Sequence, residues 1–382
     1  MQKSITVEVE PDVLKWVIKS SGWEFEELSR KLKVSSEVMK SWINKTKKPT
    51  VKQLEHLSKI VKRPFAVFLL SKVPDDKPLP NDYRMIPGKT AVYDKVTLLS
   101  LRRARRFQNV GKYLSENIRS DIVSHVEKYK LSDDPKDAAQ KYRKIFNYTK
   151  VPGDARRTFN YLRGVIEQNN IIVFQMRMPM EDVRGFTLVD ELPSVIVVNS
   201  AEPIEPRTFT LMHEFGHVLI KESGVSMPEN SLSLFNMHPV EKWCNEFAAE
   251  FLLPFSIVQA IYTEYKKSVL ETDVIEKLKN KYKVSKLMLL YNMSRYNFIT
   301  MNEFKSFLER PYAKKTEKKL KKEGEFRSPP GDKKCFSEKG RKFVSLVTNN
   351  LESGKITTGD ALDYLSIKLK NLDNVIIQMK NE

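Results

Sequence analysis

The stretch Leu211–Ile220, LMHEFGHVLI, places two of the chain's five histidines four residues apart, with a glutamate directly after the first. Side chains four residues apart lie on the same face of an α-helix. The Nε2 atoms of His213 and His217 can therefore converge on one ion, with Glu214 at the edge of the same face. The pattern predicts a zinc-hydrolase helix. The alternative is an amphipathic helix with two ordinary core histidines, and a third ligand decides between them.

Three short runs before this helix predict a small β-sheet. They are rich in valine, isoleucine and phenylalanine, and they are IIVFQM (171–176), GFTLVD (185–190) and SVIVVN (194–199). Phe209, Phe215 and Leu219 give the histidine helix an apolar face that can lie over such a sheet. Gly216 costs roughly 1 kcal/mol in a helix interior relative to alanine, which indicates close packing by another backbone.

The third ligand is expected on the next helix, within HPVEKWCNEFAAEFLLP at residues 238–254. Its candidates are Glu241, Glu246, Glu250, His238 and Cys244. Helical spacing places Glu241, Cys244 and Asn245 on one flank, which can lie against the histidine helix. Glu241 is the first choice, because two histidines and a glutamate suit a catalytic Zn²⁺ with an open fourth position for water. His238 is the runner-up, and Cys244 is expected in buried packing.

The composition indicates a globular chain with a large positive charge. The 382 residues are 41% hydrophobic, enough to bury a core in two or three domains. No run approaches the roughly eighteen apolar residues of a membrane span, and the N-terminus lacks the layout of a signal peptide, so a cytoplasmic location is expected. Cys244 and Cys335 cannot make a disulfide framework. The net charge of +18 favours a polyanionic partner such as nucleic acid.

The N-terminal residues have the cadence of a helix-turn-helix. Amphipathic helices are predicted within PDVLKWVIKSSG, EFEELSRKLKV and SSEVMKSWINK, the last of which opens on serines that suit an N-cap. We expect this last segment to be the recognition helix, with Val38 and Trp42 directed inward. The residues expected to contact DNA are Ser35, Ser36, Lys40, Ser41, Asn44, Lys45, Lys47 and Lys48. The alternative is a small helical docking domain. If the last segment does contact DNA, Glu37 would face phosphates unfavourably.

Four segments, GFTLVD, PSVIVVN, RTFTLMHEFGHVLI and EKWCNEFAAEFLLP, resemble the ImmA/IrrE family of zinc-dependent metallopeptidases. The resemblance covers roughly residues 74–254. It implies that His213, His217 and Glu241 hold Zn²⁺ and that Glu214 is the general base. The segment KKPTVKQLEHLSKIVKRPFAVFLL, followed by PLPNDYR, is also similar to family members that fuse an XRE-type helix-turn-helix domain to the peptidase.

The resemblance implies a regulatory role as well. Such proteins cleave a transcriptional repressor or another regulator and so control mobile-element or stress-response genes, which makes a protein substrate and DNA the expected partners. The alternative is a non-proteolytic DNA-binding regulator, or an antitoxin-like protein, that uses the metallopeptidase fold as a sensor or scaffold. We expect a substrate to bind extended along the strand at residues 185–190 by adding to the sheet edge. His238 and Tyr262 are the candidates for an oxyanion partner.

The chain is therefore expected to be α+β and mostly helical. An XRE-like helix-turn-helix domain at residues 1–72 precedes a proline-rich connector at 73–94 and a zincin-like metallopeptidase domain at 95–255. The remaining predicted segments are a helical region at 256–309, which suits either a second helix-turn-helix-like module or a packing module, a basic linker at 310–342, and a C-terminal helical pair at 343–382.

Overall fold

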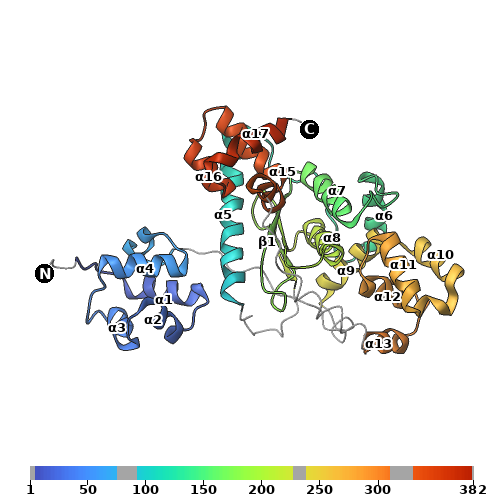
Figure 1. Ribbon diagram of the computed structural model, residues 1–382, viewed down its shortest axis with the longest axis horizontal. Helices are drawn as coiled ribbons and strands as arrows, with labels where there is room; N and C mark the ends of the chain where they lie inside the picture. Colours follow the sequence, from blue (N-terminus) through green and yellow to red (C-terminus); the bar gives the residue numbers. More distant parts are fainter. Residues whose placement is uncertain (1–4, 75–92, 227–237, 310–329, 381–382) are drawn as a thin grey trace. The chain divides into compact units, whose positions relative to one another are not determined.

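The computed structural model describes residues 5–74, 93–226, 238–309 and 330–380 (Figure 1). These residues divide into two compact units. Among the described residues, the first consists of 5–74 with 93–103, and the second of 104–226, 238–309 and 330–380. Most of the proline-rich connector expected at 73–94 lies outside the described residues, as does 310–329 of the expected basic linker.

The first unit is a bundle of short helices. Its elements are α1 Pro11–Ser21, α2 Phe25–Leu32, α3 Ser36–Ile43, α4 Val51–Val61, the 3₁₀ helix η1 Phe65–Leu69 and the beginning of α5 Lys95–Asn117. α1 ends at its C-cap Gly22, whose left-handed backbone, with φ of 73°, glycine adopts readily. Met39 and Trp42 of α3 are buried. Val38, which was expected to point inward, is half-buried and packs against the core of the first unit.

The second unit contains a four-stranded sheet in the order β1-β3-β2-β4. The strands are β1 Ile172–Met176, β2 Gly185–Leu188, β3 Val195–Asn199 and β4 Val225–Ser226. β1 and β3 run parallel, while β2 is antiparallel to both β3 and β4. The three predicted strands are confirmed, and β4 is an addition. β4 contradicts the expected substrate edge at 185–190, because its backbone already pairs with Gly185 and Phe186.

Helices make up most of the rest of the second unit, so the predicted mostly helical α+β class is confirmed. Their bounds are α6 Pro135–Ile145, α7 Ala155–Gln168, α8 Ile204–Ile220, α9 Pro239–Leu252, α10 Phe255–Tyr265, η3 Lys266–Leu270, α11 Thr272–Tyr282, α12 Lys286–Arg295, α13 Met301–Glu309, α15 Gly331–Glu352, α16 Thr358–Leu365, η4 Leu369–Asn371 and α17 Leu372–Lys380. α8 lies against β2 and β3, and α9 packs along α8 (Figure 1). Within the described ranges, no helix combines the length and the apolar character needed to cross a membrane.

The aromatic core joins the sheet to the helices. Tyr142 of α6 packs edge-on against Phe215 of α8, and Phe215 contacts Phe247 of α9. All three side chains are buried. This core fixes the spacing between α8 and α9, on which the site described below depends.

The last part of the expected basic linker, residues 331–342, is folded as a helix. α15 begins at Gly331. Cys335 and Lys339 are buried there, and the Lys339 ammonium lies 3.4 Å from the centroid of the Phe107 ring. The dense lysines of this segment had suggested a solvated chain, but this lysine covers an aromatic ring instead.

Candidate metal centre and candidate DNA-contact residues

α8 and α9 bring three predicted metal ligands together. His213 Nε2 lies 3.4 Å from Glu241 Oε2, and His217 Nε2 lies 3.2 Å from Glu241 Oε1. The ligand atoms of the three side chains lie within 4.8 Å of one another, and none of the three residues is more than 2% exposed. The spacing along α8 supplies the two imidazoles, and the flank of α9 that faces α8 supplies the carboxylate.

Each histidine is oriented through its other ring nitrogen. His213 Nδ1 lies 2.7 Å from the side-chain oxygen of Asn245, and His217 Nδ1 lies 3.1 Å from the backbone carbonyl of Glu222. Because both partners accept a hydrogen bond, each Nδ1 carries a proton, and each Nε2 faces Glu241, where it can bind a cation once it is unprotonated. This is the arrangement that metal-ligating histidines use. The orienting role of Asn245 was not predicted from the sequence.

Two glycines leave room for this arrangement. A Cβ atom on Gly216 would lie 3.2 Å from the Cα of Cys244, so the backbones of α8 and α9 approach closely there. The close backbone approach expected at Gly216 is therefore confirmed. A Cβ atom on Gly224 would lie 2.6 Å from Cε1 of His217. Any side chain at residue 224 would displace that imidazole.

The Glu214 carboxylate is fully buried beside β2. Its Oε2 accepts a hydrogen bond from the hydroxyl of Thr187 at 2.6 Å. A Cβ atom on Gly185 would lie 2.8 Å from Glu214 Oε1, so glycine provides the space that this carboxylate occupies. β2 thus positions Glu214 through Gly185 and Thr187, two residues that the sequence pattern did not single out for this purpose.

The donor set fits a divalent zinc ion. Two imidazole nitrogens and one carboxylate form the ligand combination of many catalytic zinc sites. His213 Nε2 is buried and makes no hydrogen bond within the described residues. Burial raises the pKa of Glu241, but His213 and His217 outweigh it and hold that pKa well below its ordinary value. The surroundings of Glu241 therefore favour a nearby positive charge, which a cation would supply.

The protonation of His217 also depends on the charge of Glu241. Burial lowers the pKa of His217, but Cys244 and Glu241 together raise it well above its ordinary value. A proton on the imidazole thus compensates the buried carboxylate when no cation does so. Zinc binding would release such a proton, since the ligand must be neutral imidazole.

The alternative third ligands lie elsewhere. His238 is exposed and caps α9, with Nδ1 accepting from the Val240 N–H at 3.4 Å. Cys244 is buried against Gly216, and burial raises the pKa of its thiol, which agrees with the expected packing role. Tyr262, considered as an oxyanion partner, is half-buried and packs on the Phe298 ring at 4.9 Å. Neither His238 nor Cys244 belongs to the three-ligand cluster found among the described residues.

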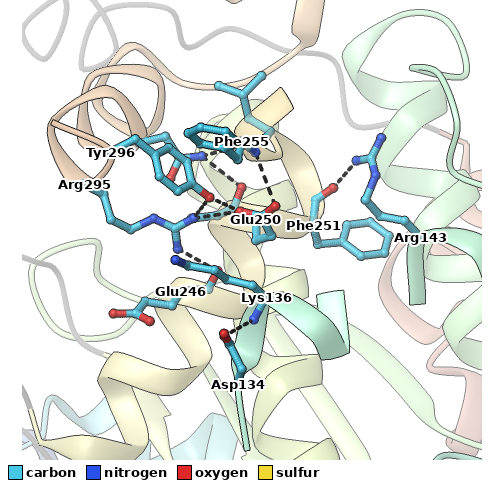
Figure 2. Close-up of polar contacts among 12 residues, drawn as sticks. Asp134, Lys136, Arg143, Glu246, Glu250, Phe251, Phe255, Arg295 and Tyr296 are labelled. Atoms are coloured by element: carbon cyan, nitrogen blue, oxygen red, sulfur yellow. Dashed lines mark hydrogen bonds and ion pairs between the residues drawn. The ribbon is translucent and has the colours of Figure 1, made fainter. Parts of the chain in front are cut away.

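Glu250, another candidate for the third ligand, instead forms hydrogen bonds that hold α9 in place. Figure 2 shows its carboxylate between Arg295, Tyr296 and the start of α10. The guanidinium of Arg295 donates to Glu250 at 2.9 Å and to the Glu246 carbonyl at 3.1 Å, and the Phe255 N–H donates to Glu250 at 3.2 Å. The C-terminal end of α9 is therefore bound by hydrogen bonds to α12.

Asn292 of α12 adds to this attachment. Its amide donates to the backbone carbonyls of Ala249 and Leu253, both at 2.9 Å. These carbonyls belong to the last turn of α9, where helical partners are missing. Within the region expected at 256–309 to be either a second helix-turn-helix-like module or a packing module, α12 packs against α9.

The expected DNA-contact residues occupy α3 and the loop after it. The Ser35 hydroxyl accepts from the Val38 N–H and caps α3. Ser36 Oγ lies 3.2 Å from Ser29 Oγ, and Ser41 donates to the Val38 carbonyl at 2.7 Å. These three serines have local structural partners.

The basic residues of this segment are exposed. Lys45 pairs with Glu10 at 3.2 Å and Lys48 with Glu8 at 2.7 Å. Such exposed pairs are weak and exchange readily with a phosphate. The remaining expected contacts are the exposed residues Lys40, Asn44 and Lys47.

Comparison with known proteins identifies one segment of the chain. Residues 166–294 match the family model of the IrrE N-terminal-like domain, Peptidase_M78. No curated protein matches the chain. The matched segment runs from the end of α7 to α12 and includes the sheet, the three clustered ligands and the helix that fastens α9. The part of the chain that holds the candidate metal centre is thus similar to a metallopeptidase domain.

Proposed function

We propose that this protein is a zinc-dependent endopeptidase. His213, His217 and Glu241 would hold the metal, and Glu214 would act as the general base. The observation that carries the proposal is the convergence of the three buried ligands, with the Glu214 carboxylate fixed on the same helix. The match of this segment to a peptidase family model supports it.

Zn²⁺ in such a site polarises the carbonyl of the scissile peptide and lowers the pKa of a water molecule. The chain's own residues supply orientation and proton transfer. Glu214 would accept the proton of the attacking water and return it to the leaving amine. Thr187 holds one oxygen of that carboxylate and so fixes the direction of the other. Asn245 and the Glu222 carbonyl hold the two imidazoles.

We further propose that the first unit binds DNA and that the substrate is a transcriptional repressor or another regulator of mobile-element or stress-response genes. The short helices α2 and α3, with basic residues after α3, support a helix-turn-helix assignment. The net charge of +18 supports a polyanionic partner. This role places the protein in the cytoplasm.

Glu214→Gln separates the peptidase from a scaffold that binds metal without cutting. The variant retains the three ligands, so it should retain zinc in elemental analysis while losing cleavage. Co-expression with the products of neighbouring genes, followed by immunoblotting, would show one partner disappear with the wild type and persist with Glu214→Gln. Equal persistence of every partner with both proteins would favour the scaffold.

DNA binding is tested by the salt dependence of affinity. Removing Lys40 and Lys47 should weaken binding to duplex DNA and reduce the slope of log K against log salt by about one for each lost phosphate contact. Lys59→Ala on α4 removes an exposed lysine outside the expected contact set and serves as the control. If Lys59→Ala weakened DNA binding as much as the changes at Lys40 and Lys47, the assignment of α3 and the loop after it as the DNA-contacting segment would be refuted.

A further inference from the structure

A pocket of about 570 Å³ lies in the second unit, apart from the metal ligands. Its walls come from α7, β1, the first turns of α8, and α15 with α17, and Figure 1 shows α15 beside β1 and α7. The charged side chains in its lining are Arg156, Arg163, Glu167, Arg207, Lys333 and Arg341. Five cations thus share the pocket with one carboxylate.

That carboxylate neutralises only one of the cations. Arg163 Nε lies 3.2 Å from Glu167 Oε1, and both side chains are buried. Arg163 also donates to the carbonyls of Phe336 and Ser337, at 3.2 and 2.7 Å. This pair therefore joins α7 to α15, and the described lining holds no second carboxylate beside its other four cations.

Arg207 is held by neutral acceptors. Its guanidinium donates to the Gln175 side-chain oxygen at 2.8 Å, to the Ser200 carbonyl at 2.8 Å and to the Glu202 carbonyl at 3.0 Å. None of these acceptors is a carboxylate. Burial lowers the pKa of Arg207 to about 10 against the opposing effect of the Glu202 carboxylate, and the neighbouring charge of Arg156 lowers it further.

Two further cations of the pocket, Arg156 and Lys333, are exposed. Their charges act on Asp154 and Asp332, but neither aspartate is among the described residues that line the pocket. Like charges held together without a counter-charge repel, and a bound anion removes this repulsion. The pocket therefore has the electrostatics of an anion site.

We propose that this pocket binds a small molecule that carries phosphate groups, of the size of a nucleotide. Its volume lies within the range of small-molecule sites, which excludes a duplex or a folded protein as the occupant of the pocket itself. Guanidinium groups match phosphate oxygens in geometry and charge. Phe336, with the Arg341 guanidinium 5.2 Å from its ring centroid, offers a flat surface for a base.

The ligand would connect two regions of the second unit. Arg156 and Arg207 lie on α7 and α8, whereas Lys333 lies on α15, beyond the segment that matches the peptidase model. This inference is independent of the proposed peptidase activity, because binding is measured without a protein substrate.

Isothermal titration calorimetry on the full-length protein at about 0.15 M salt tests the proposal. The probes are ATP, inorganic pyrophosphate, adenosine and a short duplex DNA. Arg156→Glu with Lys333→Glu reverses two exposed cations of the pocket. Arg157→Glu with Lys334→Glu changes the net charge equally at adjacent exposed residues that do not line the pocket.

ATP or pyrophosphate is expected to bind, with adenosine at least about tenfold weaker. The pocket variant should lose at least tenfold in affinity, and the control variant should retain it. Tighter binding of ATP than of pyrophosphate would assign a contribution to the base, and equal binding would assign the site to phosphate alone. Equal loss in both variants, adenosine binding as tightly as ATP, or dependence of only duplex DNA on the two pocket cations would each overturn the proposal.

Discussion

Replacing Asn245 by alanine is expected to weaken zinc binding without removing any metal ligand. Asn245 accepts a hydrogen bond from His213 Nδ1 at 2.7 Å in a site that is closed to solvent. The substitution leaves that N–H without this acceptor and frees the imidazole to rotate away from Glu241. His217 keeps its own partner, the backbone carbonyl of Glu222, because no side chain provides it.

The magnitude follows from the buried hydrogen bond. A buried donor left without its acceptor costs about 1–3 kcal/mol. Orienting partners of metal ligands typically contribute about 10–100-fold to affinity. These ranges agree, since tenfold corresponds to about 1.4 kcal/mol. The dissociation constant of Asn245→Ala for Zn²⁺ should therefore rise by about 10–100-fold.

Competition with a chromophoric chelator measures this constant, and circular dichroism establishes that each variant is folded. Asn245→Asp is the matched variant, because aspartate keeps an acceptor oxygen for His213. This variant should bind zinc at least as tightly as the wild type, whereas Asn245→Ala should bind it more weakly. A folded Asn245→Ala protein whose zinc affinity stays within about threefold of the wild type would refute the orienting role. Equal weakening by aspartate and alanine would refute it as well.

Three further substitutions test other parts of the structure. Thr187→Val removes the hydroxyl that holds the Glu214 carboxylate, so kcat should fall about tenfold or more at unchanged zinc content, and unchanged turnover would contradict this. Gly224→Ala places a Cβ atom 2.6 Å from His217 Cε1, so zinc content after dialysis should fall, and full occupancy would contradict the contact. Burial raises the pKa of Tyr142 to about 12, so its contribution to stability is complete below the ordinary value of 10 and is lost as the pH rises through 12. Urea unfolding between about pH 9 and 11 should therefore show a decline in stability that is about 1 kcal/mol smaller for Tyr142→Phe.

The candidate metal ligands could be predicted from the sequence because their geometry is local. Four-residue spacing fixes the relation of His213 to His217 on any regular helix, and helical periodicity alone places Glu241 on a flank free of large apolar side chains. Asn245 and Thr187 were not predicted as site residues. Their roles depend on which atoms of other elements lie opposite them, and no periodic signal in one segment encodes that relation.

The pairing of β4 with β2, at the edge where a substrate was expected, could not be predicted from the sequence for a different reason. Strand prediction depends on runs of β-branched and aromatic residues, and Val225–Ser226 is too short to make such a run. The Thr187 N–H nevertheless donates to the Gly224 carbonyl at 2.9 Å, and β4 pairs with the beginning of β2. The side of β2 expected to receive a substrate is thus taken by this pairing, and Gly224 also gives His217 its space.

The position of α12 explains why the peptidase-like segment extends past α9. Glu241 lies in the first turn of α9, and its position depends on where the whole helix is fixed. The other end of α9 is fixed by Asn292 and Arg295, which bind its last carbonyls and the Glu250 carboxylate. A domain ending at residue 255, as the sequence had suggested, would leave those groups without these partners at a cost of about 1–3 kcal/mol for each buried group. The family match to residue 294 includes Asn292, so the third ligand and the helix that steadies it fall within one segment.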